Sequence, residues 1–336
     1  MNARRLTVAL SLAFLVAVVA VTFVRNEDAV APSNTVLVDP AITVPTRSEG
    51  GGDVGLPTSL PGNPAVGETK EPRDWMRSYH ESADDFALAR ELLDAALLGD
   101  ARAQYWLGQV LLRCEVYKRT LARYPEGTLA TRVESYLASS IKGPEHHRSK
   151  LRREALRCAG LFSEMPFAGY DLPDEANDFR YWSTLAVESG DPIAVIDRAL
   201  RSKVNHRPSD DAERNRAFRA ALMRDVRIAV SSRDPVALFT VGGIFSDPSF
   251  AADPQQGYAW TVVACELGYD CTTSNPNWGG CVEAGTCVAG FSHADTLQRD
   301  LGATKYAQIY AQAQDIRYKL ETDDWDGLQQ YLRIKD

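Results

Sequence analysis

The sequence contains no long run of basic residues, and nowhere do more than two lysines or arginines follow one another. The 336-residue chain carries 37 lysines and arginines against 45 aspartates and glutamates, which gives a formal net charge of −8. Proteins that bind nucleic acids concentrate basic side chains to neutralise phosphates. The composition therefore predicts that this protein has no nucleic-acid partner.

The short motifs of common catalytic sites are also missing. The chain has no H-E-x-x-H zinc motif, no G-x-S-x-G nucleophile turn and no phosphate-binding P-loop. The pair His146-His147 lies in a polar stretch, where a solvated helix end is the main interpretation and a metal-binding or pH-sensing role is the alternative. We therefore assign no catalytic residue, no cofactor and no metal ligand from the sequence.

One uncharged stretch, residues 6–24, stands at the N-terminus behind the basic sequence MNARR. As a helix it would extend about 28 Å, close to the thickness of the hydrocarbon core of a membrane. We expect a single-pass anchor in a bacterial inner membrane, with Arg4 and Arg5 in the cytoplasm and the C-terminal part in the periplasm. The alternative is a secretory signal, cleaved after Ala29-Val30-Ala31, although Pro32 follows that site.

Residues 26–72 have the composition of a linker. Proline, glycine, serine and threonine dominate, as in EGGGDVGLPTSLPGNP at 49–64. Such a segment cannot bury enough apolar surface to offset the entropy lost on ordering. We predict that it is disordered and holds a folded domain, residues 73–336, away from the membrane. A short strand at 36–38 is the alternative for its first part.

Beyond Trp75 the pattern is helical, because apolar residues recur at helical spacing and alternating Val/Ile-rich runs are nearly absent. After helices that start near residues 85 and 100, the predicted helical windows are 128–141, 146–162, 174–189, 192–202, 210–231, 235–246, 254–268, 303–321 and 324–332. The fold class is therefore predicted to be all-α.

A helix-start phrase recurs along the domain: GDARAQYWLG at 99–108, SGDPIAVIDRA at 189–199 and SRDPVALFTVG at 232–242. In each phrase a small or turn-forming residue precedes an aspartate, which is a favoured N-cap, and a helix follows. Recurring helix–turn–helix units bury their apolar faces by stacking on one another. The sequence thus favours a stack of helix pairs.

The stretch 237–268 resembles a Sel1-like repeat, a relative of the tetratricopeptide repeat. The family places A-x-x-x-L-G-x-x-Y on its first helix and A-x-x-W-x-x-x-A-A-x-x-G on its second, and the residues that match are Ala237, Val241, Gly242, Phe245, Asp253, Tyr258, Trp260, Ala264 and Gly268. Two further stretches resemble the join between units, through Ala95, Ala96, Gly99, Asp100, Ala103, Gln104, Tyr105, Leu107 and Gly108, and through Phe179, Trp182, Ala186, Glu188, Gly190, Asp191 and Ala194. The glycines that end these units are farther apart than family units are long, so the predicted solenoid is interrupted or degenerate. The resemblance implies protein–protein scaffolding, often in bacterial envelope processes, and supplies no catalytic residue.

All six cysteines lie beyond residue 113, and an even number in an exported chain indicates disulfides. We predict a bond between Cys114 and Cys158, which would clamp the segment that interrupts the repeats. For the remaining four we favour the nested pairs Cys265–Cys287 and Cys271–Cys281, because a helix followed by an antiparallel return would bring them together. The crossed pairing is the main rival, and a four-thiolate zinc site is a weaker one, since its ligands are usually closer in sequence.

The stretch RSKLRREALR at 148–157 has five basic residues in ten. A solvated helix face is the main interpretation, and an acidic partner or lipid headgroups are the alternative.

From these features we expect a non-catalytic scaffold that binds a protein or peptide partner. An envelope hydrolase, or an accessory subunit of one, is the alternative, and it would need two carboxylates or a nucleophile–base pair in one cleft. A structural spacer is the third possibility.

Overall fold

A computed structural model describes residues 74–141, 145–163, 167–206, 211–271 and 292–335, and their regular structure is helical throughout. In the described part no strand forms, and Ala251 and Ile334 make one isolated antiparallel bridge. This confirms the all-α class. The helices are α2 (Trp75–Glu81), α3 (Asp85–Leu97), α4 (Ala101–Leu121), α5 (Leu129–Ser140), α6 (Glu145–Arg157), α7 (Ala159–Ser163), the 3-10 turn η1 (Asp174–Asn177), α8 (Phe179–Glu188), α9 (Pro192–Asn205), α10 (Ala212–Ser232), α11 (Pro235–Phe245), α12 (Gln255–Glu266), α14 (His293–Leu301), α15 (Ala303–Glu321) and α16 (Trp325–Gln329).

Most predicted windows coincide with these helices, and two differences have local causes. The window 174–189 is divided, because a 3-10 turn ends at Asn177 and Asp178 then caps α8 by accepting a hydrogen bond from the backbone N–H of Arg180. Helix α14 was not predicted, because its clearest sequence signal is the capping box of Ser292 and Asp295 at its start and not a long apolar pattern.

The three recurring phrases form the same local structure. Asp100, Asp191 and Asp234 cap α4, α9 and α11, and each side chain accepts a hydrogen bond from a helix backbone N–H, at 3.0, 2.9 and 2.9 Å respectively. The residue before each aspartate has a positive φ: 89° at Gly99, 79° at Gly190 and 54° at Arg233. The sequence similarity therefore reflects one recurring turn, in which a left-handed residue ends one helix and an aspartate starts the next.

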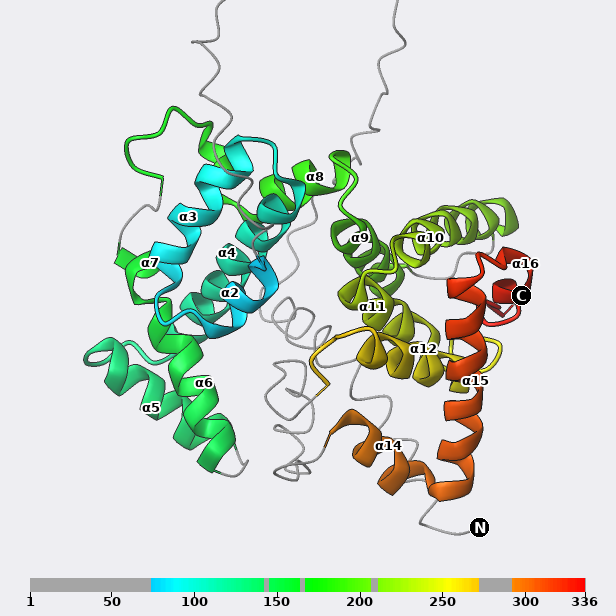
Figure 1. Cartoon of the computed structure of the whole chain (residues 1–336). Helices are drawn as coiled ribbons and strands as arrows, with labels where there is room; N and C mark the ends of the chain where they lie inside the picture. Colours follow the sequence, from blue (N-terminus) through cyan, green and yellow to red (C-terminus); the bar gives the residue numbers. More distant parts are fainter. Residues whose placement is uncertain (1–73, 142–144, 164–166, 207–210, 272–291, 336) are drawn as a thin grey trace, which may run out of the picture.

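Arg102 joins these turns in space. Its Nε lies 2.6 Å from Oδ2 of Asp191, and its Nη1 lies 2.9 Å from Oδ2 of Asp234. The first turns of α4, α9 and α11, which are far apart in the sequence, therefore lie side by side. Figure 1 shows α9 and α11 as neighbours in the middle of the molecule, with α8 between them and α4.

Two glycines let helices cross closely. A Cβ on Gly108 of α4 would lie 2.9 Å from Oγ of Ser183 on α8. A Cβ on Gly242 of α11 would lie 2.8 Å from the carbonyl oxygen of Gly257 and 2.9 Å from the backbone nitrogen of Thr261, both on α12. Such distances exclude a side chain, so glycine at these positions sets the separation between the helices.

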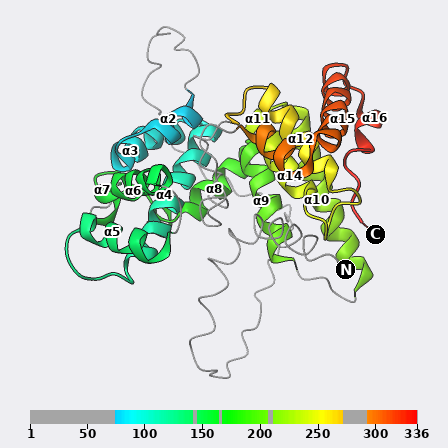
Figure 2. The ribbon, with the colours of Figure 1, turned by 90° about the horizontal axis from the view of Figure 1, so that it is seen from below.

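Helices α5, α6 and α7 interrupt the sequence between α4 and α8, as the long spacing between the repeat-like units predicts. Together with the end of α4 they build a second, smaller core, formed by Leu121, Val133, Leu137, Ile141 and Ala155. In both ribbon views α5 and α6 lie at one end of the molecule, and α15 and α16 lie at the other (Figures 1 and 2).

The predicted anchor at 6–24 and linker at 26–72 lie outside the described residues. Within the part that is described, no helix is both long enough and apolar enough to cross a membrane.

Candidate functional site

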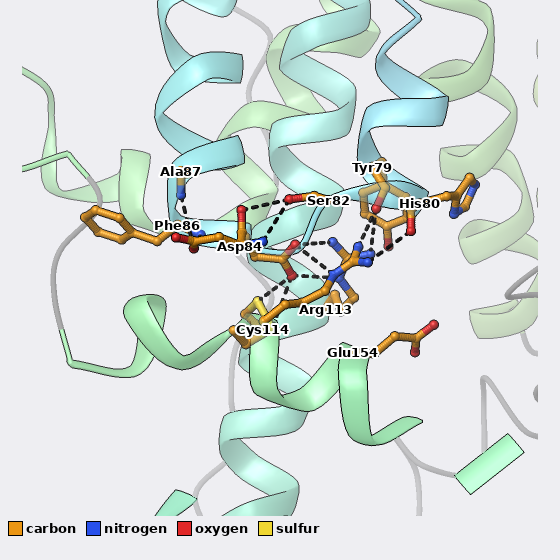
Figure 3. Close-up of polar contacts among 12 residues, drawn as sticks. Tyr79, His80, Ser82, Asp84, Phe86, Ala87, Arg113, Cys114 and Glu154 are labelled. Carbon is orange, nitrogen blue, oxygen red and sulfur yellow. Dashed lines mark hydrogen bonds and ion pairs between the residues drawn. A yellow bond between two sulfur atoms is a disulfide. The ribbon is translucent and has the colours of Figure 1, made fainter. Parts of the chain in front are cut away.

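The most concentrated group of buried charges lies where α2, α3, α4 and α6 meet, around Asp85 (Figure 3). Asp85 is completely buried at the start of α3. Its Oδ1 lies 2.8 Å from Nη2 of Arg113 and 2.9 Å from Nε of Arg157, and its Oδ2 accepts a hydrogen bond of 3.0 Å from Nε of Arg113. Both arginine side chains are nearly buried, with 11% and 8% exposed. One carboxylate therefore faces two guanidinium groups.

The arginines are also held by the C-terminal end of α2. Nη1 of Arg157 donates to the carbonyl oxygen of His80 at 3.1 Å, and both arginines donate to the carbonyl oxygen of Tyr79. The guanidinium carbon of Arg113 lies 3.9 Å from the centre of the Tyr79 ring, and the Trp106 ring packs against Tyr79 at 4.8 Å. Cations near the last carbonyls of a helix interact favourably with its dipole. The two arginines thus tie α2 to α4 and α6.

The Cys114–Cys158 disulfide, which is the bond predicted from the sequence, completes the cluster. Its sulfur atoms lie 3.3 and 3.4 Å from Oδ2 of Asp85. A disulfide carries no S–H, so these are packing contacts and not hydrogen bonds. Asp85 and the two cysteines could supply three ligand atoms within 4.8 Å of one another. Metals bind cysteine as the thiolate, however, and neither sulfur is a thiolate while the bond is intact.

Burial controls the protonation behaviour of this cluster. It raises the pKa of Asp85, while Arg113 and Arg157 oppose that rise. Burial lowers the pKa of His80 to about 4, with further contributions from Arg113 and Lys150. His80 is therefore neutral at pH 7. Every oxygen of Asp85 is in contact with an arginine or a disulfide, which is the arrangement of a structural clamp.

Asp85 is the first residue of α3, but it does not cap the helix. Asp84 instead caps α3 and accepts a hydrogen bond of 2.9 Å from the backbone N–H of Phe86, while Oγ of Ser82 donates to the carbonyl oxygen of Asp84. The adjacent Asp84 and Asp85 thus divide two tasks, one capping the helix and the other entering the core. The two neighbouring aspartates before an apolar residue were the available signal in the sequence. The partners of Asp85, however, are Arg113 and Arg157, which are too distant in sequence to be inferred.

The second described disulfide corrects our prediction, because Cys265 is bonded to Cys271 and not to Cys287. Helix α12 ends at Glu266, and Gly268, with a φ of 106°, turns the chain sharply. The Cα atoms of the two cysteines are therefore only 5.5 Å apart, within the range of a disulfide. The nested pairing overlooked this tight turn. Cys281 and Cys287 lie outside the described residues.

The basic stretch at 148–157 is largely neutralised by its surroundings. Arg152 pairs with Glu134 and with Glu145, the latter at 3.3 Å, and Arg157 pairs with Asp85. Arg148 also lies 3.9 Å from Glu145, so three of the five basic residues of this stretch have a carboxylate partner.

A different basic surface lies on α10. Four of its arginines are spaced by three, five and three residues, which places them on one side of the helix: Arg216, Arg219, Arg224 and Arg227. We call this set the α10 arginine face. None of the four forms an ion pair with a residue that the structure describes. This face was not predicted from the sequence, because its basic residues are not consecutive and recur instead at positions that share one side of a helix.

Beside this face is an open depression with a volume of about 500 Å³, between the start of α9 and the C-terminal half of α10. Its lining residues are Gly190, Pro192, Arg224, Arg227, Ile228, Ser231 and Ser232. No catalytic group was predicted in these segments, and the depression offers arginine and serine side chains beside an apolar isoleucine.

Comparison with known proteins identifies no relative, since no protein-family model, no curated protein and no solved structure matches the chain.

Proposed function

We propose that this protein is a non-catalytic scaffold that binds a protein or peptide partner through a stack of helix pairs, held outside the cytoplasm by an N-terminal anchor. The observation that carries the proposal is the α10 arginine face, because a chain with a net charge of −8 leaves four arginines on one helix side without a carboxylate partner among the described residues. Arginine is enriched at protein interfaces and among the residues that dominate binding energy.

The Sel1-like architecture is part of this proposal. It is supported by the three aspartate-capped turns that Arg102 brings together, and by the glycine crossings at Gly108 and Gly242. Trp182 and Trp260, which occupy the same position in the family pattern, are both fully buried. Stacked helix pairs of this kind present extended surfaces that suit protein binding.

The hydrolase alternative receives no comparable support. The carboxylate of Asp85 is completely buried and is surrounded by arginines and a disulfide, so it has no approach for a substrate. The depression near α10 is lined by arginine, serine and apolar residues, which do not form the acid–base pair that hydrolysis needs.

Site-specific photocrosslinking of the full-length protein in living cells tests this function. A photoreactive amino acid would replace Ile228, which lines the depression and is 43% exposed, or Tyr318, which lies on α15 and is 64% exposed. We expect a discrete protein adduct from position 228 and a much weaker one from position 318. Absence of any protein adduct from both positions would favour the spacer interpretation, and turnover of a peptide or glycan by the purified chain would favour the hydrolase.

A further inference from the structure

The depression beside α10 combines two kinds of surface. Ile228 and Pro192 provide apolar area, and Ile228, in the C-terminal half of α10, is 43% exposed. Arg224 and Arg227 stand next to this apolar area and are exposed. A partner that fills the depression would bury the isoleucine and bring its own charges within reach of both guanidinium groups.

The basic groups of α10 are all arginines, since its sequence AERNRAFRAALMRDVRIAVSS contains no lysine. A guanidinium group is planar and offers paired N–H donors that match the two oxygens of a carboxylate, whereas an ammonium group is a point charge. The one buried carboxylate of the helix, Asp225, is already paired with Arg198, through two contacts of 3.0 Å. The α10 arginine face thus supplies donors and finds no carboxylate acceptor among the residues that the structure describes.

Charge and shape together favour a peptide over a membrane surface. A membrane presents a broad plane of headgroups, which would engage a flat basic face and would leave a concave apolar patch unfilled. The depression of about 500 Å³ is open to solvent, so it would receive a side chain of a bound segment and would not enclose a whole small molecule. An aliphatic side chain would fill it, and flanking carboxylates would meet the arginines.

We propose that the depression between α9 and α10 is the docking site for an acidic segment of a partner protein, in which an aliphatic residue is flanked by aspartates or glutamates. The aliphatic side chain packs on Ile228 and Pro192, and the carboxylates pair with Arg224 and Arg227. This assignment rests on the proposed scaffold function and names its binding site and partner chemistry.

The test uses the purified full-length protein in detergent micelles and measures binding of fluorescent 12-residue peptides by anisotropy. One peptide alternates glutamate pairs with leucines, a second has glutamines in place of the glutamates, and a third has alanines in place of the leucines. We expect the first peptide to bind most tightly, and its affinity to fall as salt is raised, because exposed ion pairs are screened.

Charge reversal locates the site. The double variant Arg224→Glu/Arg227→Glu should weaken binding of the first peptide at least tenfold, and Ile228→Ser should weaken it severalfold while Ile228→Leu preserves it. The matched control is Arg77→Glu/Arg90→Glu, which makes the same change in net charge at two exposed arginines on α2 and α3. It should retain the affinity of the unchanged protein within about twofold. All replaced side chains are exposed, so each variant is expected to fold. An unchanged circular dichroism spectrum checks this.

Equal binding by the two double variants would overturn the assignment, as would equal affinity for the glutamate and glutamine peptides. Binding to phosphatidylglycerol vesicles without binding to the peptide would show that the face recognises lipid and would also overturn it. A protein adduct from position 228 that is unchanged by Arg224→Glu/Arg227→Glu would refute this docking chemistry and leave the scaffold function intact. Absence of adducts from both photoreactive positions would instead refute the scaffold function itself.

Discussion

The close crossing of α11 and α12 predicts that two adjacent glycines respond in opposite directions to the same substitution. Gly242 faces α12, where an added Cβ would meet the carbonyl oxygen of Gly257 at 2.8 Å and the backbone nitrogen of Thr261 at 2.9 Å, and would also collide with the methyl group of Thr261. Gly243 follows it on the same helix, and a Cβ there would meet no atom within 4 Å.

The expected magnitudes follow from this geometry. Replacing glycine by alanine within a helix contributes about 0.5–1 kcal/mol of stability at either position. At Gly242 this gain is outweighed, because over-packing typically costs about 1–3 kcal/mol and two of the obstructing atoms are backbone atoms that cannot rotate away. We expect Gly242→Ala to destabilise the fold by about 2 kcal/mol and Gly243→Ala to stabilise it by up to about 1 kcal/mol.

Urea denaturation of the full-length protein, followed by circular dichroism, measures both variants against the unchanged protein. In thermal denaturation of the same two variants, a difference of about 3 kcal/mol would separate their melting temperatures by about 6–12 °C for a folded unit of this size. If the two alanine variants are equally stable, α11 and α12 do not approach each other as closely as described, and the argument that glycine sets this crossing fails.

Four further predictions concern charges and bonds. Replacing Cys114 and Cys158 by alanine should lower stability by about 3–4 kcal/mol in the chain-entropy model, and a loss below about 1 kcal/mol in urea denaturation would contradict the clamp. Asp85→Asn should cost about 3–5 kcal/mol, because two nearly buried arginines lose their carboxylate. A variant as stable as the unchanged protein would show that those charges are solvated. Arg102→Leu should cost about 1–3 kcal/mol, since it leaves two N-cap aspartates without their cation, and calorimetry that shows no loss would remove its role in joining the turns. The fourth prediction concerns His293, whose pKa burial lowers to about 4, below its unfolded value near 6.5. The unfolded state therefore binds a proton more readily between these values, so stability is retained above pH 6.5 and lost as pH falls toward 4, by about 2 kcal/mol between pH 7 and pH 5. His293→Gln should remove this part of the pH dependence, and an unchanged slope in urea denaturation at several pH values would refute it.

Helix positions followed largely from local signals. The cap aspartates Asp100, Asp191 and Asp234 could be identified because an N-cap acts on the first turn of its own helix, a few residues away. Helix α14 was missed although its start carries a local signal, the capping box of Ser292 and Asp295, because its nine residues are too few to show a long apolar pattern.

The candidate site was much less accessible to sequence reasoning. The Cys114–Cys158 pair could be predicted because those two cysteines stand apart from the other four. The bond between Cys265 and Cys271 could not be chosen among three pairings, because the deciding factor is how sharply the chain turns at Gly268.

The sequence by itself determined most of the helical segments, where most helices begin and that the fold has no sheet in its described part, because these properties arise within one or two turns of the chain. Only the tertiary structure decided which charges neutralise one another. Arg152 and Arg157 find carboxylates on neighbouring helices, whereas the α10 arginine face finds none among the described residues. An ion pair needs two groups within a few ångströms, and residues far apart in sequence reach that distance only through the packing of whole helices.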